Sequence, residues 1–254
     1  MDAGPASPRP ARHPSLHPAL EGIELVVFDK DGTLISFEAM WIGWARRLGA
    51  RLEAVTRRPV AGDVFSAIGF DPVGGTIRPG APLAIETMAA IEDRIGAVLR
   101  RWCPSVPAAR RALAEAWFEP DPVELAVPLA DLGSLFGALA ASGKAIAVAT
   151  TDDRLPTEKT LAALGVGSAV ATLLCGDDDG PNKPSPEAFL AVCDRVGRAV
   201  EHSAMVGDTP ADLRMARQAG AGLVIGVLSG LSQPADLEPH ADLILESVGA
   251  LLSP

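Results

Sequence analysis

The sequence lacks any apolar run that approaches the ~18 residues of a membrane-spanning helix, so we expect no membrane partner. Cysteine is scarce as well: Cys103, Cys175 and Cys193 are odd in number and form no CxxC pair. This usage argues against a disulfide framework and a zinc site, and it favours a reducing compartment. We therefore expect a cytoplasmic chain that acts as a monomer or a homodimer.

The chain also has fewer basic than acidic residues. The chain has 22 Lys and Arg against 32 Asp and Glu, a net charge of −10, which argues against a nucleic-acid partner. Residues 36–125 contain eleven arginines, no lysine and eleven acids, so the whole deficit lies outside this segment. All four tryptophans lie inside it. This shift in composition predicts a second domain at 36–125, inserted into a core formed by 21–35 and 126–254.

The first twenty residues have no apolar stretch of their own. They are rich in Pro, Ala, Arg and His and lack the apolar centre of a secretory signal. We expect residues 1–20 to form a disordered tail. A transit peptide is a weaker alternative, because the prolines oppose an amphipathic helix.

Short apolar runs alternate with helical periodicity through most of the chain. Such runs predict strands at 26–28, 145–149, 170–174, 203–206, 223–227 and 243–245. Helices are predicted at 132–142, 156–164, 186–197 and 210–219, and in the inserted segment at 38–58, 81–101 and 107–118. The Pro and Gly content predicts a loop at 70–75. The alternation indicates an α/β fold, a parallel sheet flanked by helices, with a helical domain emerging beside the edge where the strands end.

Polar residues follow four of these apolar runs. The first run ends in Asp29-Lys30-Asp31, the second in Thr150-Thr151, a later one in Asp208, and Lys183 lies in the loop after the third. Strand ends of a parallel sheet meet at one edge, so these groups should converge. Phosphoryl transfer needs such a set: a carboxylate nucleophile, oxygen ligands for Mg²⁺, cationic and hydroxyl donors for the phosphate, and a second acid.

These residues resemble the motifs of the haloacid dehalogenase-like (HAD) phosphatase family. Asp29-Lys30-Asp31-Gly32-Thr33 matches its first motif, DxDGT, and Thr150 matches the hydroxyl motif. Lys183 matches the lysine motif, and the segment 207–212 matches the acidic motif, GDxxxD. The four motifs occur in order between residues 23 and 227. The resemblance implies a Rossmann-like core with helices on both faces and, from the position of the insertion, an α-helical cap as in phosphoglycolate phosphatase-like members.

The resemblance also implies a role for each residue. Asp29 would be the nucleophile and a Mg²⁺ ligand, and Asp208 would be the other acidic ligand. Asp31 would be the general acid and base, with its backbone carbonyl on the metal. Thr150, or its neighbour Thr151 if the match is shifted by one, would bind the phosphoryl group together with Lys183. Asp212 would support the metal or Lys183 from behind.

The second acid separates branches of this family. Dehalogenase members lack an acid at the position of Asp31, and the ion pumps carry Thr there and need membrane helices. We therefore expect a Mg²⁺-dependent phosphatase that acts on a small phosphorylated metabolite, with 2-phosphoglycolate as the best single substrate by resemblance of the cap. The alternatives are a capped sugar phosphomutase and a non-catalytic phosphate-binding module.

Several other residues have competing interpretations. Thr209-Pro210-Ala211-Asp212 also fits a helix N-terminus, so Asp212 could serve only as a cap. Lys30 should point away from both acids if the strand pattern continues past Phe28. Asp177-Asp178-Asp179 fits a solvated turn better than a metal cluster. Arg78 is the candidate for a substrate carboxylate, and the tryptophans are expected in the helical core.

Overall fold

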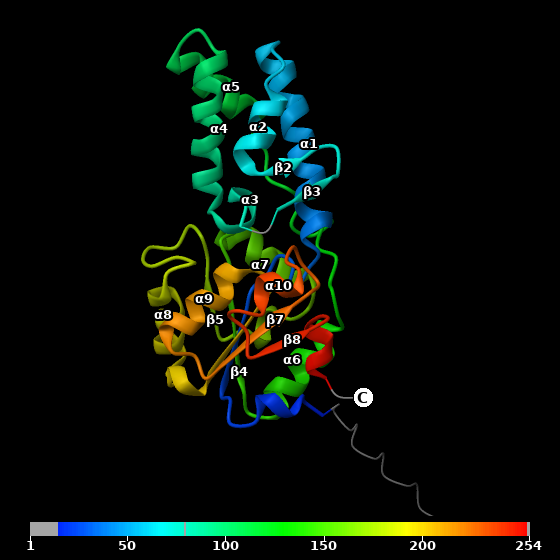
Figure 1. Cartoon of the computed structure of the whole chain (residues 1–254), viewed down its shortest axis with the longest axis vertical. Helices are drawn as coiled ribbons and strands as arrows, with labels where there is room; N and C mark the ends of the chain where they lie inside the picture. Colours follow the sequence, from blue (N-terminus) through cyan, green and yellow to red (C-terminus); the bar gives the residue numbers. More distant parts are fainter. Residues whose placement is uncertain (1–14, 79, 253–254) are drawn as a thin grey trace, which may run out of the picture.

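The computed structural model describes residues 15–78 and 80–252, so the predicted tail at 1–14 lies outside the described residues. The molecule is elongated, with a helical unit at one end and a sheet with its flanking helices at the other (Figure 1). No helix within these residues is long and apolar enough to cross a membrane.

The sheet has six strands in the order β5-β4-β1-β6-β7-β8. Their bounds are β1 Leu25–Phe28, β4 Ala145–Ala149, β5 Thr172–Leu174, β6 Ser203–Gly207, β7 Leu223–Val227 and β8 Leu243–Leu245. Every neighbouring pair is parallel, as the alternation predicted. Phe28, the last residue of β1, is in register with Val148 on one side and Val206 on the other. Whatever follows these three strands therefore emerges at the same edge.

Helices cover both faces of the sheet, as predicted. Val26 and Phe28 face α6 (Leu132–Ala141) and α7 (Arg154–Ala163), and Phe28 stacks on Phe136 at 5.4 Å between ring centroids. Leu25 and Val27 face the opposite layer, which contains α8 (Pro186–Val196), α9 (Pro210–Ala219) and α10 (Pro234–Leu237). The all-apolar composition of β1 follows, because its side chains are buried on both faces.

The end of the predicted tail belongs to the core instead. Pro18–Leu20 form a turn of 3₁₀ helix, and Leu20 is buried in the cluster that includes α6. Leu16 forms a bridge with Leu252, and the ammonium of Lys144 donates to the carbonyl of Leu20 at 2.7 Å. The prediction of disorder is therefore wrong for residues 15–20, because two leucines in a Pro-rich segment are enough to anchor it.

The remaining short elements are 3₁₀ turns that connect strands and helices of the core. They are η2 Gly167–Ala169, η3 Val200–His202 and η4 Val248–Leu251. η2 ends at Ala169, and β5 begins at Thr172, two residues later than the strand predicted at 170–174.

The inserted segment folds into a helical unit. Its elements are α1 Phe37–Thr56, α2 Ala61–Ile68, β2 Phe70–Asp71, β3 Thr76–Ile77, α3 Pro82–Ile85, α4 Met88–Trp102 and α5 Val106–Ala116. The helix predicted at 81–101 is two helices, because the side chain of Thr87 caps a new helix by accepting from the N–H of Ala90. The predicted loop at 70–75 is a small antiparallel hairpin, and α2 was not predicted.

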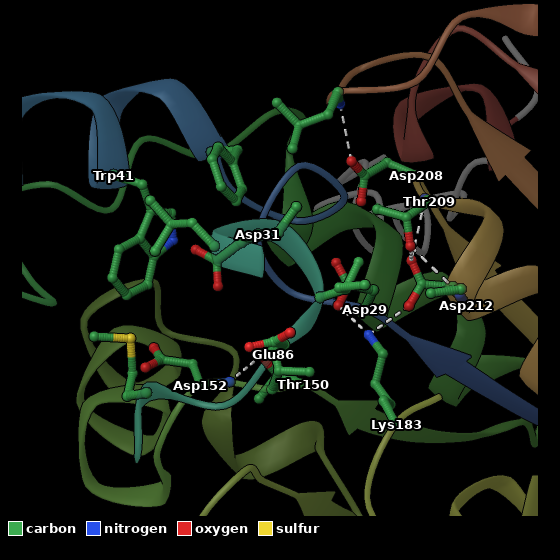
Figure 2. Close-up of a pocket in the computed structure, with 18 residues that line it drawn as sticks. Asp29, Asp31, Trp41, Glu86, Thr150, Asp152, Lys183, Asp208, Thr209 and Asp212 are labelled. Carbon is green, nitrogen blue, oxygen red and sulfur yellow. Dashed lines mark hydrogen bonds and ion pairs between the residues drawn. The ribbon is translucent and has the colours of Figure 1, made fainter. Parts of the chain in front are cut away.

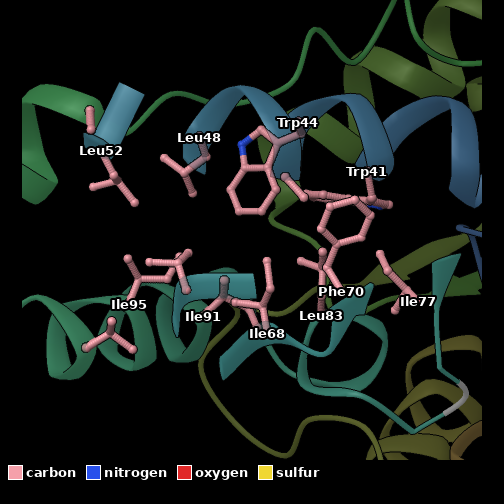
Figure 3. Packing of buried hydrophobic residues seen from close by; sticks show 14 of the residues in the cluster. Trp41, Trp44, Leu48, Leu52, Ile68, Phe70, Ile77, Leu83, Ile91 and Ile95 are labelled. Carbon is pink, nitrogen blue, oxygen red and sulfur yellow. The ribbon is translucent and has the colours of Figure 1, made fainter. Parts of the chain in front are cut away.

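The helical unit has its own hydrophobic core, lined by α1, α2 and α4 (Figure 3). Trp44 is fully buried in it, and its indole N–H donates to the carbonyl of Phe118 at 2.8 Å. Trp41 and Trp117 approach Trp44 edge-on, each at 5.6 Å between centroids. The tryptophans thus belong to the helical core as expected, although Trp41 also reaches the pocket described next.

Candidate active site

A pocket lies at the edge of the sheet where β1, β4 and β6 end, and residues of α1 and α3 line its other side (Figure 2). Its volume is about 550 Å³ including the open mouth. The structure brings the predicted residues of all four motifs to this pocket: it is lined by Asp29, Asp31, Thr150, Thr151, Lys183, Asp208 and Asp212. Residues as far apart as 29 and 212 therefore converge as the strand-end argument required.

Lys183 joins two of the acids. Its ammonium lies 2.5 Å from Asp29 Oδ1 and 2.5 Å from Asp212 Oδ1, and it also donates to the carbonyl of Ala149 at 3.2 Å. All three charged side chains are at least nine-tenths buried. Burial alone would lower the pKa of Lys183, but the two carboxylates outweigh it and raise the pKa. The lysine is thus a permanent cation beside Asp29, and a solvated loop position is excluded.

Asp212 both caps a helix and contacts Lys183, the two possibilities that the sequence left open. Its Oδ2 accepts from the backbone N–H and the hydroxyl of Thr209, while Thr209 caps the N–H of Asp212 in return, a capping box at the start of α9. Its Oδ1 points to Lys183. Helix capping therefore orients the carboxylate that holds the lysine.

The carboxylate of Asp208 is surrounded by a backbone N–H group and by small residues. Its Oδ2 accepts from the N–H of Leu231 at 2.9 Å, and its Oδ1 accepts from the hydroxyl of Thr33 at 3.4 Å. A Cβ on Gly32 would lie 2.5 Å from Asp208 Oδ2, and one on Gly230 would lie 1.9 Å from it. Gly32 also has φ +91°, a conformation that L side chains rarely adopt. Both glycines are therefore needed for the carboxylate to occupy this position.

Lys30 does not point away from Asp31, so the prediction is wrong for this acid. It is fully buried, and its ammonium lies 2.8 Å from Asp31 Oδ2 and 2.8 Å from Asp152 Oδ2. The strand alternation on which the prediction rested stops at Phe28, one residue before the acids. Asp152 had no assigned role in the sequence, although it is the third residue of the polar run after β4.

Thr150 and Thr151, the two candidates for the hydroxyl motif, differ in burial. Thr150 is 2% exposed and its hydroxyl accepts from the N–H of Asp152 at 3.1 Å. Thr151 is half-buried and also lines the pocket. Its carbonyl is closely approached by Gly176, where a Cβ would lie only 2.1 Å away. Both residues thus line the pocket, Thr150 from a more buried position.

Three carboxylates are grouped closely enough to share a metal ion. One oxygen each from Asp29, Asp208 and Asp212 lies within 4.8 Å of the others, and no other such group occurs among residues 15–78 and 80–252. Hard oxygen ligands of this kind suit a divalent cation such as Mg²⁺. The side chain of Asp31 does not belong to this group.

The electrostatics of the pocket also fit a cation. Burial, followed by the charge of Asp212 and opposed by Lys183, raises the pKa of Asp29 to about 7. Burial and the charges of Asp29 and Asp212 raise the pKa of Asp208 well above its ordinary value. Burial also raises the pKa of Asp31, although Lys30 opposes it. The two lysines do not balance these carboxylates, and a divalent cation would supply the missing positive charge.

The side of the pocket formed by the helical unit has a different character. It presents Phe37, Trp41, Leu83, Ile85 and Met88, together with one acid, Glu86. Both carboxylate oxygens of Glu86 are held by the guanidinium of Arg94.

Two other candidates from the sequence lie outside the pocket. Arg78 is exposed and lines a separate hollow beside Phe70, so the structure does not bring it to the acids. Asp177 and Asp178 hold Arg154: Asp178 accepts from its guanidinium at 2.8 and 2.7 Å, and Asp177 accepts from its backbone N–H. Two acids of the run at 177–179 are thus bonded to Arg154, and the run forms no metal cluster.

The fold and the pocket together define a class. Residues 23–220 match the model of the haloacid dehalogenase-like hydrolase family, and the chain belongs to this family. The family membership predicted from the four motifs is therefore confirmed. The expectation of a hydrolase of the phosphatase type is confirmed as well.

Within that class the chain is similar to phosphoglycolate phosphatases. It is 33% identical to the enzyme of Rhodospirillum rubrum over 135 residues, about half of either chain (53% and 54%). It is 28% identical to that of Shigella boydii over 250 residues, 91% of this chain and 92% of the relative.

Solved structures share the fold. One is described as a predicted phosphoglycolate phosphatase from Haemophilus somnus, with a TM-score of 0.62, 18% identity and coverage of 90% and 96% of the two chains. Another is β-phosphoglucomutase from Clostridium difficile, with a TM-score of 0.60, 16% identity and coverage of 89% and 94%.

Proposed function

We propose that this chain is a Mg²⁺-dependent phosphatase that hydrolyses a small phosphate monoester through an aspartyl-phosphate on Asp29. The observation that carries the proposal is the position of Asp29, which is buried at the end of β1 between Lys183 and the carboxylates of Asp208 and Asp212. Lys183 holds Oδ1, which leaves Oδ2 as the attacking oxygen.

The first half of the reaction transfers the phosphoryl group to the protein. Asp29 Oδ2 bonds to phosphorus while the bond from phosphorus to the ester oxygen breaks. The departing alkoxide takes a proton from Asp31, whose pKa is raised by burial, a shift that favours the protonated form of this acid. Lys183 and the hydroxyls of Thr150 and Thr151 donate to the phosphoryl oxygens.

The second half regenerates the protein. Asp31, now ionised, accepts a proton from water, whose oxygen attacks phosphorus and displaces the carboxylate of Asp29. Lys30 and, behind it, Asp152 hold Asp31 in place for both steps. Asp29, Asp208 and Asp212 would hold Mg²⁺, which when bound neutralises charge on the phosphoryl group.

The helical unit at 36–125 is proposed to act as a cap. Its apolar residues over the pocket would exclude water from the reacting centre and contact the leaving group. The names of the relatives make 2-phosphoglycolate the first substrate to test. Location in the cytoplasm and the oligomeric state remain predictions from the sequence.

The decisive test is the variant Asp29→Asn, assayed for phosphate release from p-nitrophenyl phosphate with Mg²⁺. Asparagine keeps the shape but cannot attack phosphorus, so we expect kcat to fall about 10⁴-fold or more. Asp194→Asn, an exposed position on α8, is the matched control and should retain full activity. Retention of activity by Asp29→Asn would contradict the nucleophile assignment.

A capped phosphomutase is the second candidate, because its chemistry uses the same pair of acids and a β-phosphoglucomutase shares this fold. Isomerisation of a sugar phosphate without phosphate release would favour it. Binding of beryllofluoride and Mg²⁺ with no turnover of any ester would instead indicate a phosphate-binding module.

A further inference from the structure

A second cavity adjoins the acid pocket. Its volume is about 650 Å³ including the open mouth, and it shares Trp41, Met88 and Asp152 with the acid pocket. Trp117 and Met40 continue its apolar lining, whereas Glu92, Glu119 and Asp153 supply carboxylates. The two cavities therefore meet at Trp41, Met88 and Asp152.

The cavity has carboxylates but no basic side chain among the described residues that line it. Asp152 is paired with Lys30, but the carboxylates of Glu92, Glu119 and Asp153 have no hydrogen bond or ion pair within the described parts of the chain. Burial, followed by the charges of Asp177, Asp152 and Glu119, raises the pKa of Asp153 to about 6. The negative potential here is therefore not compensated by the protein.

The aromatic residues of the helical unit fall into two groups. The guanidinium of Arg46 lies over Phe70 at 5.9 Å, and those of Arg47 and Arg51 lie over Phe118 at 5.8 and 4.7 Å. Within the described residues, no cation of the protein lies over Trp41 or Trp117. The two indoles that line the cavity are therefore not paired with a cation of these residues, and tryptophan is the strongest aromatic partner for a cation.

A carboxylate on the leaving group would find no partner in either cavity. Lys183 is the one basic side chain among the described residues that line the acid pocket, and it is already shared by Asp29 and Asp212. Glu86 lines the same pocket, and the guanidinium of the neighbouring Arg94 is already bonded to its carboxylate. Introducing another anion here would cost desolvation and repulsion without compensation.

We infer that the second cavity binds an organic ammonium group carried by the alcohol part of the substrate, against Trp41 and Trp117 and beside Glu119 and Asp153. This inference rests on the proposed function, and it names the substrate class as phosphate monoesters of amino alcohols. Indole faces and unpaired carboxylates are the two features that recognise such cations, and they occur together here.

The test compares three esters that differ in the charge of the leaving group: phosphocholine, its uncharged isostere 3,3-dimethylbutyl phosphate, and 2-phosphoglycolate. We expect kcat/KM for phosphocholine to exceed that of the isostere about tenfold and that of 2-phosphoglycolate by more, as one good cation site allows. Equal values for the isosteric pair, or a preference for 2-phosphoglycolate, would overturn the inference. Hydrolysis of p-nitrophenyl phosphate tests the proposed function separately.

The variant Glu119→Gln tests whether a preference for phosphocholine over its isostere arises in the second cavity. It should reduce the ratio of phosphocholine to isostere several-fold, whereas Glu115→Gln, the same change on the outer side of α5, should leave the ratio as in the wild type. If no ester is hydrolysed, binding of phosphocholine and of the isostere is compared by calorimetry. Tighter binding of phosphocholine then supports the cation site although the proposed function has failed, and equal binding contradicts it.

Discussion

The two sides of the active-site pocket differ in almost every respect. The side formed by the sheet carries the acids and the lysine proposed to react, which are held by ion pairs, backbone N–H groups or a helix cap. The side formed by the helical unit is apolar, apart from Glu86, which Arg94 neutralises. The contrast supports the proposed division of roles, in which the sheet would perform the chemistry and the helical unit would select what is attached to the phosphate.

The two sides are also built differently. On the sheet side, the position of a group follows from the place where its strand ends, because the register of β1 with β4 and β6 fixes these points relative to each other. On the other side, the lining depends on how α1, α3 and the start of α4 pack on a separate hydrophobic core. Substitutions on the sheet side should therefore have the larger effects on turnover.

After Asp29→Asn, the largest effect on the sheet side is expected for Lys183→Met. Methionine keeps the apolar length of the side chain but removes the cation from Asp29 and Asp212, both of which are buried. We expect kcat/KM for p-nitrophenyl phosphate to fall about 10²- to 10³-fold, the usual loss for a donor to a developing charge. Steady-state kinetics at saturating Mg²⁺ give the measurement.

Lys159→Met is the control for this substitution, because Lys159 is an exposed residue of α7. Its kcat/KM should remain within about twofold of the wild-type value, because exposed positions usually tolerate substitution. A loss of less than about tenfold for Lys183→Met would mean that the sheet side does not depend on this lysine, and the contrast between the two sides would weaken.

A smaller effect is expected where the sheet side depends on the absence of a side chain. Gly230→Ala would place a Cβ only 1.9 Å from Asp208 Oδ2, so the carboxylate must move. We expect the Mg²⁺ concentration for half-maximal activity to rise about 10- to 100-fold, as for other changes that disturb a ligand's surroundings. Gly137→Ala is the control, since a Cβ there meets nothing within 4 Å. An unchanged Mg²⁺ requirement would exclude Asp208 from the metal site.

The sheet and its site could be predicted from the sequence because the signals are local. An apolar run that stops at a carboxylate needs no knowledge of distant residues, and parallel strands then bring Asp29, Asp208 and Lys183 together. The pairing of Lys30 with Asp152 could not be found in this way. The two residues are 122 positions apart, and their meeting depends on how the chain turns after each strand ends.

The helical unit was harder to predict for the same reason. Helical periodicity at 81–101 continues across Glu86 and Thr87, so it concealed the break that brings Glu86 and Met88 to the pocket. Arg78 was a reasonable candidate by charge, but the hairpin beside it faces another hollow. Burial of Leu20 likewise depends on contacts with α6 that no local pattern in a Pro-rich segment reveals.

The smallest effect is expected at Asp153, where the sheet side meets the helical unit and faces Glu119. Its pKa is raised in the folded state from 3.8 to about 6, chiefly by burial and then by neighbouring acids. Between these two values the unfolded chain releases a proton that the folded chain retains, so the residue makes the protein less stable as pH rises through this window. Above about pH 6 the cost is fully present, and below about pH 4 it is absent.

Asp153→Asn removes this titration and should therefore stabilise the metal-free protein at neutral pH but not in acid. Because the side chain is partly exposed, we expect a gain of only ~1 kcal/mol in the free energy of unfolding. Urea unfolding of both proteins near pH 4 and near pH 7.5 measures the difference, and titrations common to both cancel. A gain of the same size at both pH values would show that Asp153 does not share an uncompensated negative field with Glu119, and the acidic border between the two sides would lose its physical basis.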